Sequence, residues 1–137
     1  MNIVVIDGQG GRMGRQLIEA IRTAGIACDI TAIGTNVLAT SAMLKAGADR
    51  GATGENPVIV AARSAQVIVG PIGILAADAM LGEITPAMAV ALGQSRATKL
   101  LLPVNSCRNL VIGTQQMTLS QIIAQTVAQL RAMASNE

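Results

Sequence analysis

The chain has 137 residues, a formal net charge of +2 and 51% hydrophobic residues, yet it contains no Phe, Trp, Tyr or His. Without aromatic rings it lacks the usual stacking platform for single-stranded nucleic acid, and its Lys and Arg residues are dispersed, so we expect no nucleic-acid partner. With no His, and with Cys28 and Cys107 far apart in the chain, zinc sites and His-assisted cysteine catalysis are excluded.

Short apolar runs rich in β-branched residues predict strands along the whole chain. In chain order these runs are Asn2–Ile6, Asp29–Ile33, Arg50–Ala52, Gln66–Val69, Lys99–Pro103 and Leu110–Ile112. The runs Val67-Ile68-Val69 and Leu100-Leu101-Leu102 are apolar at every position, which is typical of central strands covered on both faces.

Helical patterns separate these strands. They are predicted at about Gly11–Thr23, Asn36–Ala46, a short helix capped by Asn56 before Pro57, Ile74–Leu81, a helix from Thr85-Pro86 to near Gly93, and Thr118–Ala134. Strands that alternate with helices imply right-handed crossovers and a parallel sheet. We therefore predict one domain over residues 1–137, an α/β, three-layer Rossmann-like domain with a mostly parallel sheet and helices on both faces.

A glycine-rich segment joins the first strand to the first helix. Its residues are Asp7, Gly8, Gln9, Gly10, Gly11, Arg12, Met13 and Gly14. A strand that ends in glycines and continues as a helix exposes unpaired backbone N–H groups, which can hold a phosphate. We predict that this segment binds the phosphate of a nucleotide or dinucleotide. The alternative is a tight turn with no ligand.

Asp7 complicates this prediction, because a carboxylate beside a bound phosphate repels it. Asp7 could instead accept a ribose or substrate hydroxyl, or help to hold Mg²⁺ as an outer partner. With equal weight, it could simply cap nearby N–H groups at the end of the strand.

Two further loops are expected at the carboxyl ends of the strands, where ligands bind in such sheets. They are Gly34-Thr35-Asn36 and Gly70-Pro71-Ile72-Gly73, both predicted to bind the cofactor, while Thr53–Asn56 carries less weight. NAD-selective sites usually place an acid after the second strand. Thr35 and Asn36 stand there instead, so NADP is slightly favoured over NAD, unless these residues only cap the second helix.

Residues with reactive side chains are few. Asn105-Ser106-Cys107-Arg108 follows the fifth strand, and Arg108 would favour the thiolate of Cys107, but a single Cys with no His anywhere is a poor catalytic constellation. General acid–base chemistry would fall to carboxylates, namely Asp7, Glu55, Asp78 or Glu83. We assign no catalytic residue and no metal ligand.

Charged residues make up 13% of the chain, about half the usual share of roughly 25%. This deficit predicts that another copy covers part of the surface, so we expect a homo-oligomer. We expect no membrane partner, because no clean run of 18 apolar residues is present, and no signal peptide. A reducing, cytoplasmic location is the simplest interpretation of the cysteines.

Two resemblances add to this interpretation. The string Gly-Gly-Arg-Met-Gly-Arg-Gln-Leu-Ile, at Gly10–Ile18, looks like the cofactor loop of dihydrodipicolinate reductases. Those enzymes also carry a substrate domain with histidines, so their activity is not carried over to a chain without His. Over nearly its whole length the sequence resembles an uncharacterised bacterial family of short Rossmann-like proteins, catalogued as a domain of unknown function. The strings that carry this resemblance are Ile6–Gly11, Gly34–Ala48, Gly51–Asn56, Val69–Gly73, Gly82–Pro86 and Leu102–Asn105.

The leading hypothesis is a nucleotide-binding protein, with NADP or NAD favoured, that acts as a sensor or a subunit. The second is a small oxidoreductase or isomerase whose site is completed at a subunit interface. The third is a structural, oligomer-forming protein without a ligand.

Overall fold

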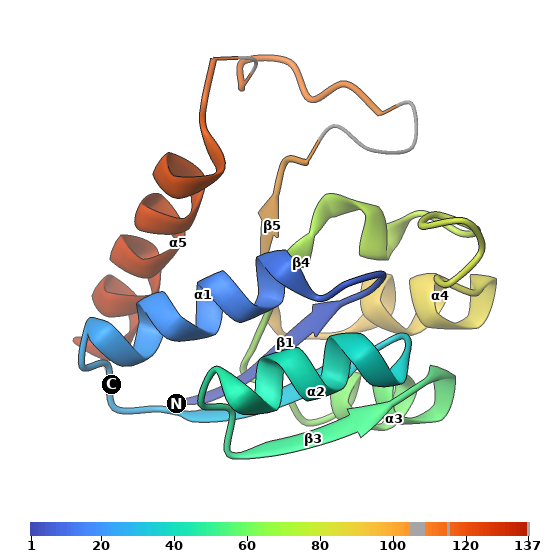
Figure 1. The fold of residues 1–137 in the computed structure, drawn as a ribbon, viewed down its shortest axis with the longest axis horizontal. Helices are drawn as coiled ribbons and strands as arrows, with labels where there is room; N and C mark the ends of the chain where they lie inside the picture. The colour runs from blue at the N-terminus through green and yellow to red at the C-terminus, as the bar shows by residue number, and fades with distance from the viewer. Residues whose placement is uncertain (105–108, 115, 137) are drawn as a thin grey trace.

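Five strands form one sheet in the computed structural model, which describes residues 1–104, 109–114 and 116–136 (Figure 1). The strands are β1 (Asn2–Asp7), β2 (Asp29–Gly34), β3 (Arg50–Thr53), β4 (Val67–Pro71) and β5 (Thr98–Leu102). Their spatial order is β3-β2-β1-β4-β5, and every neighbouring pair is parallel. Because the order reverses between β1 and β4, the crevice beyond the carboxyl ends of these two strands is where such sheets bind ligands.

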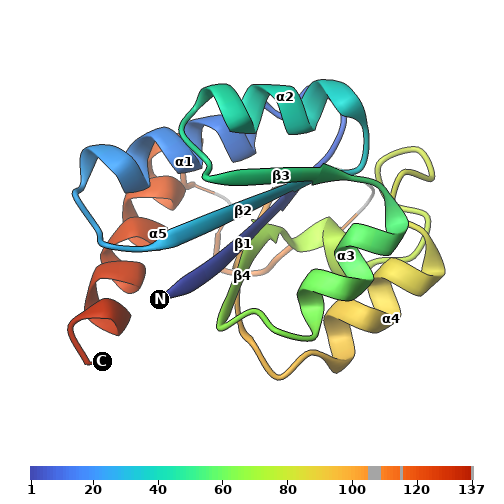
Figure 2. The same ribbon diagram turned by 90° about the horizontal axis from the view of Figure 1, so that it is seen from below.

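Helices cover both faces of the sheet, so the predicted α/β, Rossmann-like, three-layer architecture is confirmed. They are α1 (Arg12–Thr23), α2 (Val37–Lys45), α3 (Glu55–Ala62), the 3-10 helix η1 (Ile72–Leu75), α4 (Pro86–Gln94) and α5 (Leu119–Ala134). Figure 2 shows α1 and α2 on one side of the sheet and α3 and α4 on the other. Helix α5 packs beside α1.

Two apolar cores hold these layers together, and β1 contributes to both because successive side chains of a strand point to opposite faces. Ile3 and Val5 are fully buried in the core under α1, α2 and α5. Val4 and Ile6 are buried in the core under α3 and α4. This double burial explains why the four central residues of β1, Ile3–Ile6, are all apolar, and it fixes the carboxyl end of β1 at the centre of the sheet.

Three helices begin where the sequence predicts them to begin. The side chain of Asn36 accepts a hydrogen bond from the N–H of Ala39 (2.9 Å), and Thr85 and Thr118 cap α4 and α5 in the same way. The prediction that Asn56 caps the third helix was wrong. That helix begins at Glu55, and Gly54 takes the cap position with φ 104°.

Two predicted elements were wrong. Ile74–Leu81 is not an α-helix: after η1 the chain turns, and Asp78, Met80 and Leu81 adopt left-handed φ values of 66°, 58° and 56°. The apolar spacing was misleading because Ile74 and Met80 are buried without a regular helix between them. Leu110–Ile112 is not a strand, and Leu110 and Ile112 are 64% and 80% exposed.

Among the described helices, none is long and apolar enough to cross a membrane.

Candidate functional site

A buried carboxylate closes the junction between β1 and α1. Asp7 is the last residue of β1 and is 6% exposed. Its Oδ1 accepts a hydrogen bond from the N–H of Gly8 and its Oδ2 accepts one from the N–H of Gly14, each 2.8 Å long. Of the roles that the sequence suggested for Asp7, the structure therefore shows that it caps nearby N–H groups.

The environment of Asp7 disfavours its charge. Burial raises the pKa of Asp7, the bonds from Gly14 and Gly8 lower it, and the nearby carboxylate of Glu83 raises it again, so the pKa lies above its ordinary value. Asp7 thus sits at the base of the crevice as a carboxyl group whose proton is held more tightly than usual.

The amides of the glycine-rich segment divide into two groups. Those of Gly8, Gln9, Gly11 and Gly14 donate to Asp7 Oδ1, Glu83 Oε1, Gly8 O and Asp7 Oδ2, respectively. The N–H groups of Gly10, Arg12 and Met13 have no hydrogen-bond partner in the part of the chain that the structure describes. Arg12 and Met13 open the 12-residue helix α1, so their amides carry the positive end of its dipole.

The regularly spaced glycines of this segment are explained by packing. A Cβ at Gly8 would lie 2.5 Å from Thr35 Oγ1, one at Gly11 would lie 2.6 Å from Ala39 Cα, and one at Gly14 would lie 2.5 Å from Met43 Sδ. Gly11 also has φ 70°, which favours glycine. These three glycines let the loop, α1 and α2 approach closely, so they need no ligand to account for them.

Gly10 differs from these glycines. Apart from its two chain neighbours, no heavy atom of the described residues lies within 4 Å of the position that its Cβ would take, and its φ is outside the left-handed region. The described fold therefore gives no steric reason for glycine here. The open space over Gly10 lies beside its unpaired N–H group.

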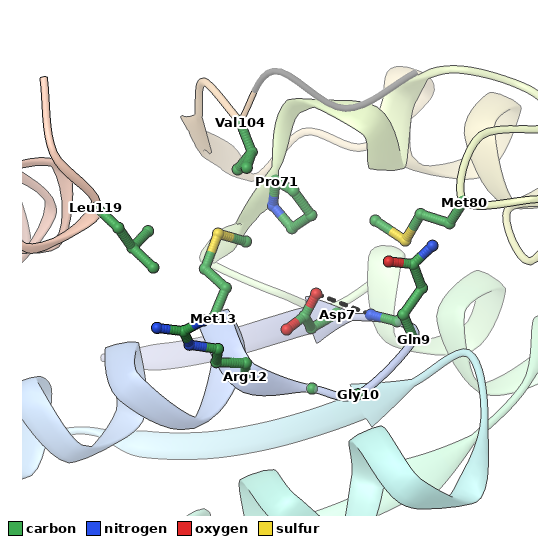
Figure 3. Close-up of a pocket in the computed structure, with 11 residues that line it drawn as sticks. Asp7, Gln9, Gly10, Arg12, Met13, Pro71, Met80, Val104 and Leu119 are labelled. Carbon is green, nitrogen blue, oxygen red and sulfur yellow. Dashed lines mark hydrogen bonds between the residues drawn. The ribbon is translucent and has the colours of Figure 1, made fainter. Parts of the chain in front are cut away.

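A cavity of about 440 Å³ opens over this segment (Figure 3). Its lining comprises Asp7, Gly8, Gln9, Gly10, Gly11, Arg12, Met13, Pro71, Met80, Val104 and Leu119. The backbone of the glycine-rich segment forms one side. Met13, Pro71, Met80, Val104 and Leu119, from five separate parts of the fold, form an apolar wall around the Asp7 carboxylate. The cavity thus combines backbone amide donors and the positive charge of Arg12 with an apolar wall.

The other predicted cofactor residues are placed differently. Gly14 packs against Met43, Gly34 packs against Thr40, and Gly70 packs against the carbonyl oxygen of Ile6. None of these three glycines lines the cavity. Ile72 and Gly73 belong to η1 and do not line it either. Of the Gly70–Gly73 loop, only Pro71 does.

Thr35 and Asn36 are engaged by a carboxylate from the connection between η1 and α4. Glu83 Oε1 accepts hydrogen bonds from Thr35 Oγ1 (2.7 Å), Asn36 Nδ2 (2.6 Å) and the N–H of Gln9 (3.1 Å). Partial burial raises the pKa of Glu83, but these bonds outweigh it and hold the pKa below its ordinary value. The donors on which the NADP preference depended therefore face the protein's own carboxylate.

The connection that carries Glu83 is held in an unusual conformation. Non-glycine residues in the left-handed region cost of order 1–3 kcal/mol each, and Asp78, Met80 and Leu81 all adopt it. Backbone bonds from Asp78 N to Ile84 O (2.7 Å) and from Ile84 N to Ala79 O (3.1 Å) stabilise the turn. As a result, the Met80 side chain lines the cavity and the Glu83 carboxylate accepts a hydrogen bond from Gln9 in the glycine-rich segment.

The remaining candidates lie elsewhere. Glu55 accepts a hydrogen bond from Thr85 Oγ1 (2.6 Å), Asp78 is exposed, and neither lines the cavity. The predicted segment Asn105-Ser106-Cys107-Arg108 lies outside the described residues. Within the described ranges, no group of His, Cys, Asp or Glu residues could hold a metal ion.

Sequence reasoning missed Met80, Val104 and Leu119 as cavity residues. Val104 could have been found, because it directly follows the fifth predicted strand. Met80 and Leu119 gave no such signal, since they reach the cavity only through the turn after η1 and the packing of α5.

Comparisons with known proteins identify the family of the chain. A family model described as "Domain of unknown function (DUF3842)" matches residues 2–135, which confirms the resemblance to an uncharacterised family. No curated protein matches the chain. Among solved structures, the chain is similar to a dodecameric FMN-dependent Ubix-like decarboxylase from Escherichia coli O157:H7. The identity is 14% and the TM-score 0.43, over 97% of this chain and 93% of that one. A likeness this weak carries no argument about ligand or activity.

Proposed function

This chain belongs to the DUF3842 family, and because the family's description names no activity, we propose a function from the site alone. The protein binds a phosphate-bearing nucleotide in the cavity over the glycine-rich segment. In this proposal residues 1–137 form one nucleotide-binding domain that acts as a sensor or as a subunit of a larger assembly.

The observation that carries this proposal is the environment of Gly10. Its N–H and those of Arg12 and Met13 are unpaired among the described residues, and a side chain at position 10 would project into open space. Unpaired amides at a helix N-terminus are an established way to bind phosphate. The Arg12 side chain is exposed and adds a positive charge beside them.

The proposed ligand is a dinucleotide, NADP or NAD, bound through its pyrophosphate. The apolar wall of Met13, Pro71, Met80, Val104 and Leu119 suits the uncharged part of such a ligand, since burying apolar surface favours binding. The cavity has no aromatic side chain on which a base could stack, because the chain contains none.

One observation favours a catalytic role as a second candidate. Asp7 lies on the cavity wall with a pKa above its ordinary value, as a general acid or base that works near neutral pH requires. This candidate is the small oxidoreductase or isomerase of the sequence analysis. If it is correct, Asp7→Asn abolishes a measured turnover without changing nucleotide affinity.

Assembly into a homo-oligomer is part of the proposal. Large apolar side chains are exposed on the surface of a single chain, including Val37 (72%) and Leu38 (74%), and burying such surface drives association. Light scattering at micromolar concentration tests this, and a monomeric mass would reject it.

The direct test of the function is isothermal titration of the protein with NADP, NAD, ATP, ADP and FMN. We expect saturable binding of at least one of them, weakened by Gly10→Ala. Gly93→Ala is the matched control, because Gly93 also has open space around it and an ordinary φ but lies in α4, away from the cavity. Absence of binding across the panel would reject the proposal.

A further inference from the structure

We infer that Glu83 determines ligand specificity at this site, by accepting the hydroxyl groups of a ribose and repelling a phosphate group attached to them. The inference rests on the proposed nucleotide-binding function and names the class of ligand, a nucleotide with a free ribose diol.

The location of the Glu83 carboxylate supports this inference. In Rossmann-like nucleotide sites the ribose lies at the carboxyl end of the second strand, beside the glycine loop, and an acid there accepts its hydroxyl groups. In this chain β2 ends at Gly34 and is followed by Thr35 and Asn36, so no acid comes from this position of the sequence. Glu83 supplies a carboxylate to the same place from the connection between η1 and α4.

The hydrogen bonds of Glu83 fix which oxygen is available. Oε1 accepts from Thr35 Oγ1, Asn36 Nδ2 and Gln9 N, whereas Oε2 has no partner among the residues that the structure describes. Three donors from two loops orient the carboxylate, so its second oxygen is positioned to accept hydrogen bonds from a ligand. The side chain is only partly buried, and it contacts Gln9, which lines the cavity, without lining the cavity itself.

The negative charge of Glu83 determines whether a free ribose diol or a 2′-phosphate is favoured. Thr35 and Asn36 direct their donors to Glu83 and do not offer them to a phosphate. A 2′-phosphate at this place would meet a carboxylate at close range, and like charges a few ångströms apart repel strongly. The expectation of a preference for NADP is therefore reversed: a free diol, as in NAD, is favoured over a 2′-phosphate.

Neutralising the carboxylate without removing its hydrogen bonds tests this. In Glu83→Gln the amide oxygen can still accept from Thr35, Asn36 and Gln9, so the loops stay in place. The affinities of NAD and NADP, and of 5′-AMP and adenosine 2′,5′-bisphosphate, are measured for the wild type and the variant. Asp29→Asn is the matched control, because it removes the same charge at the amino end of β2, where Asp29 pairs with Arg50.

We expect the wild type to bind each diol ligand at least about tenfold more tightly than its 2′-phosphorylated partner. Glu83→Gln reduces that ratio about tenfold, and Asp29→Asn leaves it unchanged. Equal affinities in the wild type, or an unchanged ratio in a folded Glu83→Gln, would overturn the inference while leaving nucleotide binding intact. Failure of all four ligands, and of the wider nucleotide panel, would instead reject the proposed function together with the inference.

Discussion

The N–H group of Gly14 donates a 2.8 Å hydrogen bond to Oδ2 of Asp7, which joins the third residue of α1 to the last residue of β1. The protein thus supplies its own anion to one amide at the start of α1. The amides of Arg12 and Met13, two residues and one residue earlier, donate to no carboxylate among the described residues. The start of α1 is therefore divided between an internal carboxylate and an open set of donors.

This arrangement makes stability depend on the protonation of Asp7. Because burial raises the pKa of Asp7 in the folded state, the protonated form is favoured there more than in the unfolded chain. The contribution of Asp7 to stability is fully present below the ordinary aspartate pKa and is lost as pH rises through the folded value. Urea unfolding from about pH 4 upward, of the wild type and of Asp7→Asn, measures this.

We expect the free energy of unfolding of the wild type, relative to Asp7→Asn, to fall as pH rises. The comparison with the variant removes the contributions of the other carboxylates. If the difference between the two proteins stayed constant over the pH range, Asp7 would not be perturbed as described.

Replacing each of two neighbouring glycines by alanine should affect different properties, ligand binding at Gly10 and stability at Gly11. Gly10→Ala places Cβ in open space, so we expect stability within about 1 kcal/mol of the wild type but at least about tenfold weaker nucleotide binding. Gly11→Ala brings Cβ to 2.6 Å from Ala39 Cα at φ 70°, so we expect about 2–4 kcal/mol of destabilisation.

Thermal or urea unfolding, combined with titration, separates the two effects. Loss of stability in Gly10→Ala would show that position 10 is packed against the protein. Unchanged affinity in a stable Gly10→Ala would remove the strongest argument for a ligand there.

The sequence was a good guide to most of the sheet, but Leu100-Leu101-Leu102, which was predicted to be central, lies in the edge strand β5, where Leu100 and Leu101 are only partly buried. Val67-Ile68-Val69 became a central strand because its side chains are buried on both faces, and Thr85 and Thr118 became helix caps because their hydroxyls accept from residues three positions later. The two helix caps are local relationships between residues close in the chain, and the burial of Val67-Ile68-Val69 can be predicted because all three residues are apolar.

The failures involve tertiary contacts. Ile74 to Leu81 has helical spacing, but the chain instead makes a left-handed turn that buries Met80 and leaves Leu81 97% exposed. The bonds of Glu83 to Thr35 and Asn36 span 48 and 47 residues and appear in no local pattern. The glycine-rich segment was identified from sequence, but its division into packed glycines and open amides required the neighbouring helix.

Arg12 tests the electrostatic part of the site. Its side chain is exposed and lines the cavity, so Arg12→Gln should leave stability within about 0.5 kcal/mol of the wild type. Nucleotide affinity should fall about three- to tenfold, because a charge-assisted contact to phosphate is lost. Titrations at low and high salt check the cause: the wild type should lose more affinity with added salt than the variant. Equal salt dependence would mean that Arg12 does not contact the phosphate.

Leu81 tests the strained turn. Its side chain is 97% exposed and its φ is 56°, a conformation that asparagine adopts more readily than leucine. Leu81→Asn should therefore raise the free energy of unfolding by about 0.5–1 kcal/mol, since little packing is lost. Urea unfolding at neutral pH measures the change. A loss of stability would indicate that Leu81 is covered, for example by a second copy of the chain.

Backbone amide NMR addresses the central claim most directly in a protein of 14.0 kDa. On titration with the nucleotide that binds most tightly in the panel, the ¹H–¹⁵N signals of Gly10, Arg12 and Met13 should shift furthest among those of residues 7–14. The signals of Gly8 and Gly14, whose N–H groups already donate to Asp7, should shift less. If the titration saturates while the signals of Gly10, Arg12 and Met13 do not shift, the nucleotide binds elsewhere and the proposed site is wrong.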